Sequence, residues 1–501
     1  MANLVALAFL VVLVAYLILK FLETRRRFAG KGVPNPPELP FIGVMGKNAM
    51  AQKHMVDVLG EIYGFRPEAK YVGCHFFLNP MVVIRDLDLI KSVLIKDFDY
   101  FADRKVFVDE DADPLFGKNL VSLNGPRWKE VRSILTPSFT TNKMRAMFVL
   151  MSRCADTFSR TLVQTRADSP AIDTKDAFTR YANDVIASCA FGFEVDSLKD
   201  PDNEFYVNGR ESLAKFGRFS LESFIMFFVP ALGRRLGLQL IPKKNSCYFI
   251  DLIDKTMKER REKGRSRPDM LQLLMDAQDK THDLDVLDIT AQAYLFFLGG
   301  FETVSTQMCW MAHEMAIHQD VQRRVQEEID QMMRDCDGQP TYEAINNLNY
   351  LDAVFSETLR VHPLPTLNRV CAKEFVLPPA YPGAEPFVVE PGIEIVVPVH
   401  SIQHDPLYYD EPDRFDPERF ADKRSTTSDV VTLGFGLGPR MCIGNRFAIL
   451  ETKIVFVHLL AKCNLVTCDK TCVPTRYDKR IFMPTADGGF WLRIEPREKP
   501  A

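Results

Sequence analysis

The sequence predicts a mainly α-helical protein with a minor β-sheet region. Its clearest helical pattern runs from Asp288 to Ala316, with apolar residues on nearly every face, as in a helix buried at the centre of a fold. Short β-branched runs such as Met81–Ile84 and Ile393–Pro398 are bounded by Pro, Gly or Asp and predict a few strands. No linker, repeat or low-complexity block divides residues 55–501, so we expect a single domain there.

The composition excludes several classes of protein. Of 501 residues, 47% are hydrophobic and 26% charged, which is typical of a globular chain with a large core. The formal net charge of -4 gives no electrostatic support for a nucleic-acid partner. The 11 cysteines are odd in number and widely scattered, which favours a reducing compartment over a disulfide scaffold.

The N-terminus has the pattern of a membrane anchor, predicted over residues 1–24. Leu4–Leu19 is uninterrupted apolar sequence, and Phe21 and Leu22 bring it close to the roughly 20 residues of a membrane-spanning helix. A cleaved signal peptide fits less well, because no basic residue precedes the run and no small-residue cleavage site follows it. Arg25–Arg27 come directly after the run, so the positive-inside rule places the rest of the chain in the cytosol.

Residues 25–54 form a predicted basic and proline-rich neck. The prolines of Pro34–Pro40 exclude a helix and favour a stiff extended segment, although an ordinary Pro-rich loop would have the same composition. A second apolar stretch, Phe224–Leu232, is followed by two arginines. It fits a segment that dips into the membrane surface and equally a buried core segment.

The segment Phe435–Gly444 carries the residue of greatest chemical interest. It places Cys442 in a loop with three glycines and a proline, immediately before a helical pattern over Asn445–Leu460. Glycines let the backbone approach a flat cofactor, and amides at a helix start stabilise a thiolate. Such a loop suits a thiolate metal ligand, but an isolated cysteine before a helix is more often inert.

The wider motif removes much of that ambiguity, because F-x-x-G-x-R-x-C-x-G resembles the haem-ligand signature of the cytochrome P-450 family. Its specified positions are Phe435, Gly438, Arg440, Cys442 and Gly444. The resemblance implies that Cys442 ligates the iron. One departure is Gly434, where many relatives have proline, which predicts a less rigid loop.

Three further motifs occur in the family's order. Glu357 and Arg360 match E-x-x-R, and Arg419 lies in a P-x-x-F-x-P-E-R-F segment; the resemblance implies a buried structural triad of the three. Glu302 and Thr303 match the acid and alcohol of the family's proton relay in the central helix. The glycines before them, Gly299 and Gly300, also fit a simple close crossing of helices.

The fourth motif concerns the haem propionates. Trp128 and Arg132 match W-x-x-x-R, and Arg369 and Arg440 resemble the other propionate-binding arginines. A surface stack of Trp on Arg is the alternative for the first pair. The family fold places the haem between the long central helix and the cysteine loop.

The resemblance implies a haem-thiolate monooxygenase that contains haem b and inserts one atom of O2 into a small apolar substrate, either a xenobiotic or an endogenous lipid-like molecule. Electrons would come from NADPH-cytochrome P-450 reductase, with cytochrome b5 as a second candidate donor. The chain looks most like animal microsomal, xenobiotic-metabolising members, with insects as a candidate source. The expected location is the endoplasmic reticulum membrane, with the catalytic domain in the cytosol and membrane lipid as a contact.

Two rival functions remain. The first is a haem-thiolate isomerase or dehydratase that rearranges a peroxide, and the intact Glu302-Thr303 pair argues against it. The second is a haem-binding sensor or carrier.

Substrate contacts are expected from residues 106–120, the start of the long helix, 364–367 and the region of Thr485. The predicted apolar wall residues are Phe116, Phe297, Leu364 and Leu367. Arg127 and Lys129 are candidates for reductase docking, or ordinary solvent-facing charges.

Overall fold

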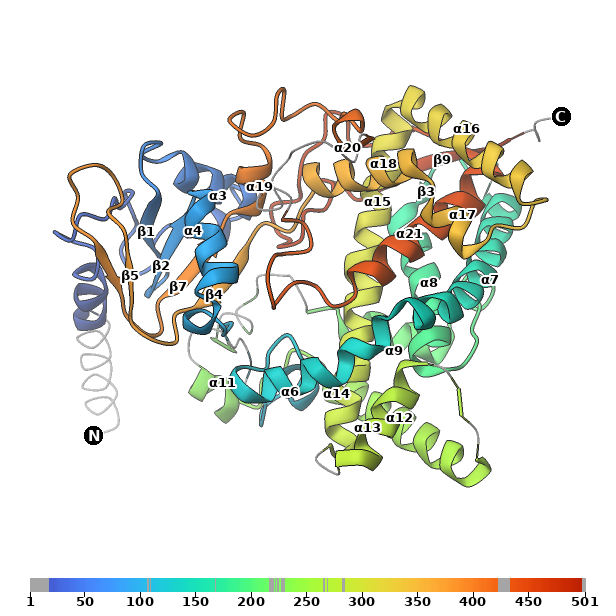
Figure 1. Cartoon of the computed structure of the whole chain (residues 1–501), viewed down its shortest axis with the longest axis horizontal. Coiled ribbons are helices and arrows are strands. Elements are labelled where there is room, and N and C mark those ends of the chain that lie inside the picture. The colour runs from blue at the N-terminus through green and yellow to red at the C-terminus, as the bar shows by residue number, and fades with distance from the viewer. Residues whose placement is uncertain are drawn as a thin grey trace, which may run out of the picture.

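The structure is a computed structural model that describes residues 18–497 except 106–107, 109, 167, 216–219, 221, 223–224, 227–229, 265, 268, 282–283 and 422–432. Figure 1 shows the strands β1, β2, β7 and β4 gathered at one side of the molecule and most of the long helices at the other. This arrangement confirms the prediction of a mainly α-helical fold with a small β region.

The principal sheet has four strands in the order β1-β2-β7-β4. Strand β1 (Tyr71–Phe76) pairs antiparallel with β2 (Asn79–Ile84), which pairs parallel with β7 (Glu394–Val397), and β7 pairs antiparallel with β4 (Leu367–Val370). The remaining strands form a three-stranded sheet and a hairpin: β3 (Ile172–Asp173), β9 (Trp491–Pro496), β8 (Cys463–Val466), β5 (Phe375–Leu377) and β6 (Phe387–Val389).

The helices make up most of the described chain. In order they are α2 (Gly46–Ala49), α3 (Met55–Gly64), α4 (Leu87–Lys91), η1 (Ser92–Lys96), η2 (Phe98–Tyr100), α5 (Pro114–Gly117), α6 (Gly125–Leu135), η3 (Thr136–Phe139), α7 (Thr141–Arg166), α8 (Thr174–Ile186), η4 (Ala187–Phe191), α9 (Glu204–Ser212), α11 (Pro230–Arg235), α12 (Lys243–Lys263), α13 (Met270–Thr281), α14 (Val286–Leu298), η5 (Gly299–Val304), α15 (Ser305–Ile317), α16 (Gln319–Asp335), α17 (Tyr342–Asn346), α18 (Asn349–Val361), α19 (Val399–Gln403), α20 (Glu418–Ala421) and α21 (Asn445–Leu460).

The predicted central helix is present as α14, η5 and α15, which run through the helical part as one column (Figure 1). It begins at a capping box, in which the Asp288 amide donates to the Asp285 carboxylate at 2.6 Å and the Asp285 amide donates back to Asp288. Residues 289–298 and 304–306 are buried, because apolar residues cover the helix on all sides. Helix α21 packs along α7 and contacts η5, which places the loop before α21 opposite the middle of the column.

The segment before α3 lies against the sheet. The Asn35 side-chain amide donates to the carbonyl of Gly73 at 2.8 Å, and the Glu38 carboxylate accepts from the His75 amide at 2.7 Å. Residues 33–45 are therefore fixed to β1 rather than spaced away from it.

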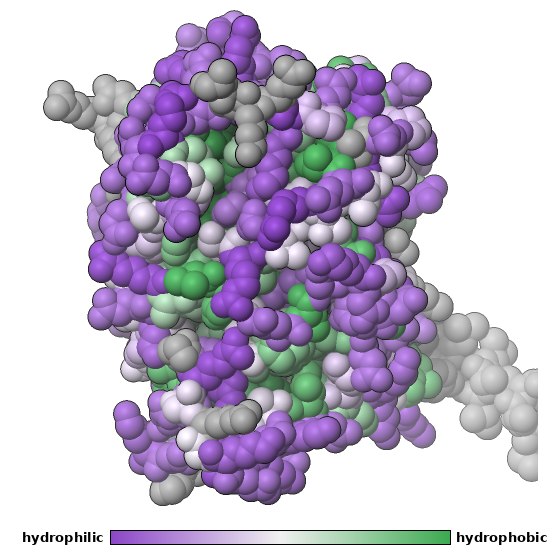
Figure 2. All heavy atoms as spheres, turned by 90° about the vertical axis from the view of Figure 1, so that its right-hand side faces the viewer, coloured by the Kyte–Doolittle hydropathy of each residue, from purple (hydrophilic) through white to green (hydrophobic). Residues whose placement is uncertain are grey.

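Both predicted membrane segments fall partly on residues outside the described ranges. The anchor prediction lies mostly on residues 1–17; residues 18–25 are helical, and no helix among the described residues is long and apolar enough to cross a membrane. In the Phe224–Leu232 stretch, Met226 is buried and Leu232 is 42% exposed. Figure 2 shows the helical end of the molecule, where hydrophobic side chains appear mainly in furrows between rows of hydrophilic ones.

Candidate active site

The cysteine loop is held in shape by its own backbone. The Cys442 amide donates to the carbonyl of Phe435 at 2.9 Å, and the Phe435 ring stacks on Phe355 of α18 with centroids 6.1 Å apart. Gly438 has a φ of +74° and lies against the carbonyl of Leu94, so any side chain there would collide with backbone. Gly444 lies at the start of α21, as the sequence predicted.

Gly434, the departure from the family pattern, has a packing reason. A Cβ at this position would run into the side chain of Leu359 on α18. Leu359 thus occupies the space that a larger residue at position 434 would need.

The central helix changes its hydrogen bonding beside this loop, since Gly299–Val304 forms a π-helical turn. The Thr303 hydroxyl donates to the Gly299 carbonyl at 2.5 Å. The two glycines have separate roles: a Cβ on Gly300 would strike Ile186 of α8, whereas a Cβ on Gly299 would meet no atom within 4 Å. The close helix crossing considered from the sequence is therefore present at Gly300, whereas Gly299 has free space beside it.

Helix α21 contacts η5, so the cysteine loop at the start of α21 lies near this turn. Thr303 and Cys442 are exposed to a solvent-sized probe although their neighbours along the chain are largely enclosed. Burial nevertheless raises the pKa of the Cys442 thiol above its usual value, while the Gly444 amide, Arg132 and Arg104 act in the opposite direction and favour the thiolate. A cysteine that is accessible yet surrounded by protein lines an internal hollow, which we name the haem hollow because its residues fit that group.

The guanidinium groups beside the haem hollow support this fit. Arg369 and Arg440 are buried, and burial is the main reason that their pKa values are lowered to about 9. Arg104 lowers both values further, together with Arg440 in the case of Arg369 and with Arg132 in the case of Arg440. Arg369 Nε and Arg440 Nη1 are buried without a hydrogen-bond partner. Among the described residues none of these four arginines forms an ion pair within 4 Å, so the cluster suits an anionic group such as the haem propionates.

Trp128 lies against Arg440, with the guanidinium 4.1 Å from the centre of the indole ring. Arg440 also donates to the carbonyl of Ala102 at 2.8 Å and to that of Leu123 at 2.9 Å. Arg132 lies one turn after Trp128 on α6, and its charge interacts with Cys442.

Arg104 is a site residue that the motifs did not reveal. Its guanidinium donates to the Arg440 carbonyl at 3.3 Å, and its Nε is buried without a partner. Burial lowers the pKa of Arg104, Cys442 raises it and Arg132 lowers it. The one clue in the sequence was that Arg104 is a basic residue just before residues 106–120, the segment expected to contact substrate.

Glu302, the acid of the predicted relay, forms an ion pair with Lys175 of α8 at 3.0 Å. The same ammonium group donates to the hydroxyls of Ser305 at 2.9 Å and Thr306 at 2.7 Å. Lys175 therefore binds the π-helical turn, through Glu302, and the first residues of α15 that follow it. The carboxylate and the Thr303 hydroxyl are adjacent in sequence but have different partners in this structure.

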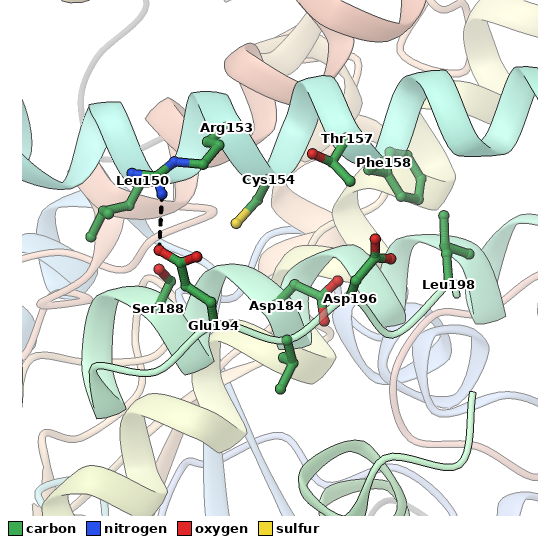
Figure 3. Close-up of a pocket in the computed structure, with 11 residues that line it drawn as sticks. Leu150, Arg153, Cys154, Thr157, Phe158, Asp184, Ser188, Glu194, Asp196 and Leu198 are labelled. Atoms are coloured by element: carbon green, nitrogen blue, oxygen red, sulfur yellow. Dashed lines mark hydrogen bonds and ion pairs between the residues drawn. The ribbon is translucent and has the colours of Figure 1, made fainter. Parts of the chain in front are cut away.

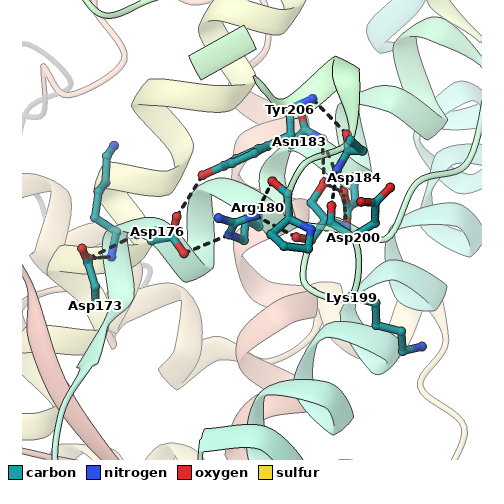
Figure 4. Close-up of polar contacts among 12 residues, drawn as sticks. Asp173, Asp176, Arg180, Asn183, Asp184, Lys199, Asp200 and Tyr206 are labelled. Atoms are coloured by element: carbon teal, nitrogen blue, oxygen red, sulfur yellow. Dashed lines mark hydrogen bonds and ion pairs between the residues drawn. The ribbon is translucent and has the colours of Figure 1, made fainter. Parts of the chain in front are cut away.

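Helix α8, which carries Lys175, is held by a polar network shown in Figure 4. Asp173 caps the helix by accepting from the amides of Lys175 and Asp176 at 2.9 and 3.2 Å. Asp176 accepts from Arg180 at 2.9 Å and from the Tyr206 hydroxyl at 3.0 Å. These contacts hold α8 in place and so fix the position of Lys175 along the central helix.

The predicted triad is assembled. Arg360 and Glu357 are fully buried and joined by two hydrogen bonds, Nε to Oε2 at 2.6 Å and Nη2 to Oε1 at 2.7 Å. Arg419 is a looser member, with its Nε 3.5 Å from Glu357 Oε1 and its Nη2 donating to the Glu411 carbonyl. Arg360 additionally donates to three backbone carbonyls of the segment that leads to the cysteine loop: those of Gln403, Pro412 and Arg414.

The four predicted substrate-wall residues lie in different parts of the structure. Phe297 is fully buried and packs among Phe205, Phe249 and Phe301 with ring centroids 4.8–5.4 Å apart, so its side chain belongs to the packing between α14, α9 and α12. Leu367 lies over Gly436 of the cysteine loop. Leu364 is half-buried, and Phe116 is buried in the wall of a separate cavity.

A small polar cavity of about 320 Å³ lies between α7, α8 and the segment after η4 (Figure 3). Its charged groups have partners within the protein: Arg153 pairs with Glu194 at 2.9 Å, and Asp184 accepts from the Ser197 amide and hydroxyl at 3.0 and 2.5 Å. Burial raises the pKa of Asp184 to about 7. These contacts explain the cavity as part of the α7–α8 packing.

An accessible cysteine with unsatisfied buried arginines beside it, in a loop near a π-helical turn, fits a haem-thiolate site. Comparison with known proteins agrees: the family description "Cytochrome P450" matches residues 33–491. The chain is 42% identical to cytochrome P450 9e2 of Blattella germanica, covering 97% of this chain and 96% of that protein.

Two Drosophila melanogaster proteins are also similar: probable cytochrome P450 9f2 at 38% identity, over 94% of this chain and 95% of that protein, and probable cytochrome P450 6a21 at 34%, over 98% and 99%. The chain belongs to the cytochrome P450 family. Membership implies a haem ligated by a cysteine thiolate and oxidoreductase activity of the monooxygenase type. The suggested insect affinity is confirmed by these relatives.

Proposed function

We propose that this protein inserts one oxygen atom from O2 into a small apolar substrate, a xenobiotic or an endogenous lipid-like molecule. The observation that carries the proposal is the accessible Cys442 thiol, beside which Arg104, Arg369 and Arg440 have buried nitrogens without a hydrogen-bond partner among the described residues. Haem b, held through its iron by the Cys442 thiolate, would supply the oxidising centre.

The chain's own residues would bind and orient the cofactor, and they would move protons to the reacting site. Arg104, Arg369 and Arg440, whose buried nitrogens have no partner among the described residues, would bind the anionic groups of the cofactor. The Thr303 hydroxyl can donate a proton into the hollow, and Glu302 can restore it after exchanging its contact with Lys175. The buried residues on both sides of the turn limit access by bulk water.

Electrons would come from NADPH through a separate cytochrome P-450 reductase, because the sequence has no G-x-G-x-x-G nucleotide loop. Arg127 on α6 is half-exposed and Lys129 is exposed, so both are candidates for docking the reductase. Cytochrome b5 is a second candidate electron donor. The apolar run Leu4–Leu19 followed by Arg25–Arg27 supports an anchor in the endoplasmic reticulum membrane, with the catalytic domain in the cytosol.

The test begins with the ferrous carbonyl complex of the purified holoprotein, which should have the Soret band shifted by a thiolate ligand. Oxygen and NADPH consumption are then measured with purified reductase and a panel of apolar substrates. Turnover of an organic hydroperoxide without O2 or reductase would favour the isomerase or dehydratase. Normal reduction without product from any substrate would favour a sensor or carrier.

A further inference from the structure

A carboxylate, an imidazole and a phenol form a hydrogen-bonded series inside the helical part, and the proposed site does not use them. Glu314 Oε1 on α15 lies 2.8 Å from His362 Nε2, directly after α18. His362 Nδ1 lies 2.9 Å from the hydroxyl of Tyr477. Glu314 and His362 are buried, and Tyr477 is half-buried. Three segments far apart in the sequence thus place an acid, a base and a phenol in order.

The acid of this series is ionised and the phenol is not. Although burial alone would raise the pKa of Glu314, hydrogen bonds from His318 and His362 lower it to about 2. Burial of the Tyr477 hydroxyl, and then the charge of Glu314, raise the pKa of the phenol above its usual value. Because the carboxylate accepts from His362 Nε2, the neutral imidazole presents Nδ1 as an acceptor to the phenol O–H. The phenol therefore keeps its proton at rest and contacts a base.

The base is connected to solvent through the same carboxylate. The other oxygen of Glu314, Oε2, lies 3.5 Å from His318 Nε2, and the side chain of His318 is 36% exposed. The hydrogen bond to Glu314 raises the pKa of His318. A positive charge that arises on His362 would thus lie against an ionised partner, and protons can exchange with solvent at His318.

Trp310 connects the phenol and the imidazole to the central helix. Its indole ring stacks on His362 with centroids 3.7 Å apart and meets the Tyr477 ring edge-on at 5.6 Å. Trp310 follows Thr303 on the column by about 10 Å along the helix axis. Its Nε1 donates at 2.7 Å to the carbonyl of Pro484, directly before Thr485 in the region expected to contact substrate. The aromatic rings therefore extend from the central helix to that region.

Two other buried phenols lack one of these features. The Tyr63 hydroxyl donates to the Asp405 carboxylate at 2.6 Å, but the Arg85 guanidinium lies 4.6 Å from the centre of the Tyr63 ring. A cation beside a ring disfavours the loss of an electron from it. The hydroxyl of Tyr294 bonds to the Ser212 hydroxyl at 3.0 Å, which is not a base. Tyr477 is therefore better placed for oxidation than either of them.

We infer that Tyr477 is a redox-active tyrosine, whose phenol gives one electron to the oxidised haem centre and its proton to His362 Nδ1. The products on the protein are a phenoxyl radical and an imidazolium that is paired with Glu314. A phenol that has lost an electron is a strong acid, so a positioned base makes this oxidation easier. A one-electron donor such as ascorbate then returns the electron, and His362 returns the proton. The inference rests on the proposed haem-based oxidising centre and gives that centre a second reductant when no substrate is bound.

The test uses the full-length holoprotein without substrate, mixed with an organic hydroperoxide and frozen for electron paramagnetic resonance. At mildly alkaline pH, where imidazole is neutral, we expect a tyrosyl signal that narrows when the tyrosines are ring-deuterated. Tyr477→Phe should lose this signal. Tyr63→Phe, the matched control, removes another buried hydrogen-bonded phenol and should keep it. In Glu314→Gln the signal should fall about tenfold or more, because the imidazolium loses a charge-assisted hydrogen bond.

The ferrous carbonyl spectrum separates this inference from the proposed function. Absence of the thiolate-type spectrum in the parent protein would overturn the proposed function and this inference with it. A normal carbonyl spectrum without a tyrosyl signal would overturn the inference alone, as would a signal that persists in Tyr477→Phe or disappears in Tyr63→Phe. Glu314→Gln leaves the phenol in place and decides the matter if Tyr477→Phe does not incorporate haem, because an undiminished signal there would also overturn the inference.

Discussion

Arg369 shows how a buried charge can mark a missing partner. The residue is 1% exposed, and among the described residues its side chain donates only to the neighbouring Asn368 carbonyl, at 2.7 Å. Burial, and then two other arginines, lower its pKa to about 9. Such a cation costs stability unless an anion compensates it. The arrangement is therefore explained by the bound cofactor and not by the protein alone.

Replacement of this residue should consequently weaken haem retention. In Arg369→Met we expect haem to transfer to apomyoglobin about 10- to 100-fold faster, corresponding to roughly 1.5–3 kcal/mol for a charge-assisted hydrogen bond. Arg153→Met on α7, whose guanidinium pairs with Glu194, is the control. Equal transfer rates in the two variants would remove Arg369 from the cofactor site.

Thr303 permits a second test at the level of one atom. Thr303→Ala removes the hydroxyl that faces the haem hollow, and loss of a positioned acid commonly costs at least about 100-fold in the step that it assists. Peroxide released per NADPH should rise and product should fall, with total NADPH oxidation less affected. Thr303→Ser keeps the hydroxyl and should stay close to the parent; unchanged coupling in the alanine variant would exclude the relay role.

Sequence motifs located some of these residues and not others, for a physical reason. Cys442, Gly438 and Arg440 lie in one loop, so these residues are close together both in the sequence and in the folded protein. Arg104 and Lys175 act through contacts with segments far away in the chain, at Arg440 and Glu302 respectively. No local pattern encodes those contacts, and they became visible only in the folded chain.

At the scale of helices, α18 connects the triad to the cysteine loop. Arg360 binds both oxygens of Glu357 and three carbonyls of the incoming segment, whereas Arg419 is 16% exposed at its side chain and contacts one oxygen at 3.5 Å. Breaking a buried ion pair costs about 3–5 kcal/mol, and a partly exposed one less. The two arginines are thus unequal members of the triad.

We therefore predict a graded loss of haem incorporation. Arg360→Leu should yield little or no protein with the thiolate-type carbonyl spectrum, and Arg419→Leu an intermediate amount, when haem content per folded protein is compared after identical expression. Arg414→Leu, at an exposed position with an ion pair to Glu411, serves as the control. A larger effect at Arg419 than at Arg360 would contradict this ranking.

The elements themselves were largely predictable, because their periodicity is local. The helix Asn445–Leu460 matches α21, and the two β-branched runs correspond to β2 and β7. The parallel pairing of β2 with β7 joins residues about 310 positions apart and could not be inferred from either run. The π turn at Gly299 likewise depends on Ile186 of α8 and on Lys175, although its glycines marked the place.

For the whole molecule, the first question is attachment to the membrane. Deletion of residues 1–24 removes the apolar run but leaves the segment from Asn35 to Glu38 bound to β1, so the body should still fold. We expect most of the truncated protein to remain in the supernatant after sedimentation with microsomes, with its carbonyl spectrum intact. Undiminished sedimentation would shift the attachment to the Phe224–Leu232 stretch.

Stability of the molecule should depend on pH through buried histidines. Burial lowers the pKa values of His313, His404 and His458 from 6.5 to about 4, so the folded state binds fewer protons than the unfolded state between these values. The full stability is present above pH 6.5 and is lost as the pH falls toward 4. His318 and Asp184 have raised pKa values, so each gains stability as the pH falls and offsets part of this loss.

From pH 6.5 to 5.5 the three histidines together should lower the free energy of unfolding by about 3 kcal/mol, or about 1 kcal/mol each. Urea unfolding of the holoprotein, followed by circular dichroism at constant ionic strength, measures this change. His458→Gln tests one member, because glutamine can still contact Ser152, whose hydroxyl lies 3.0 Å from the imidazole. Its decline over the same interval should be smaller by about 1 kcal/mol, since one proton fewer is taken up on unfolding. A decline parallel to that of the parent protein would mean that His458 titrates normally in the folded state.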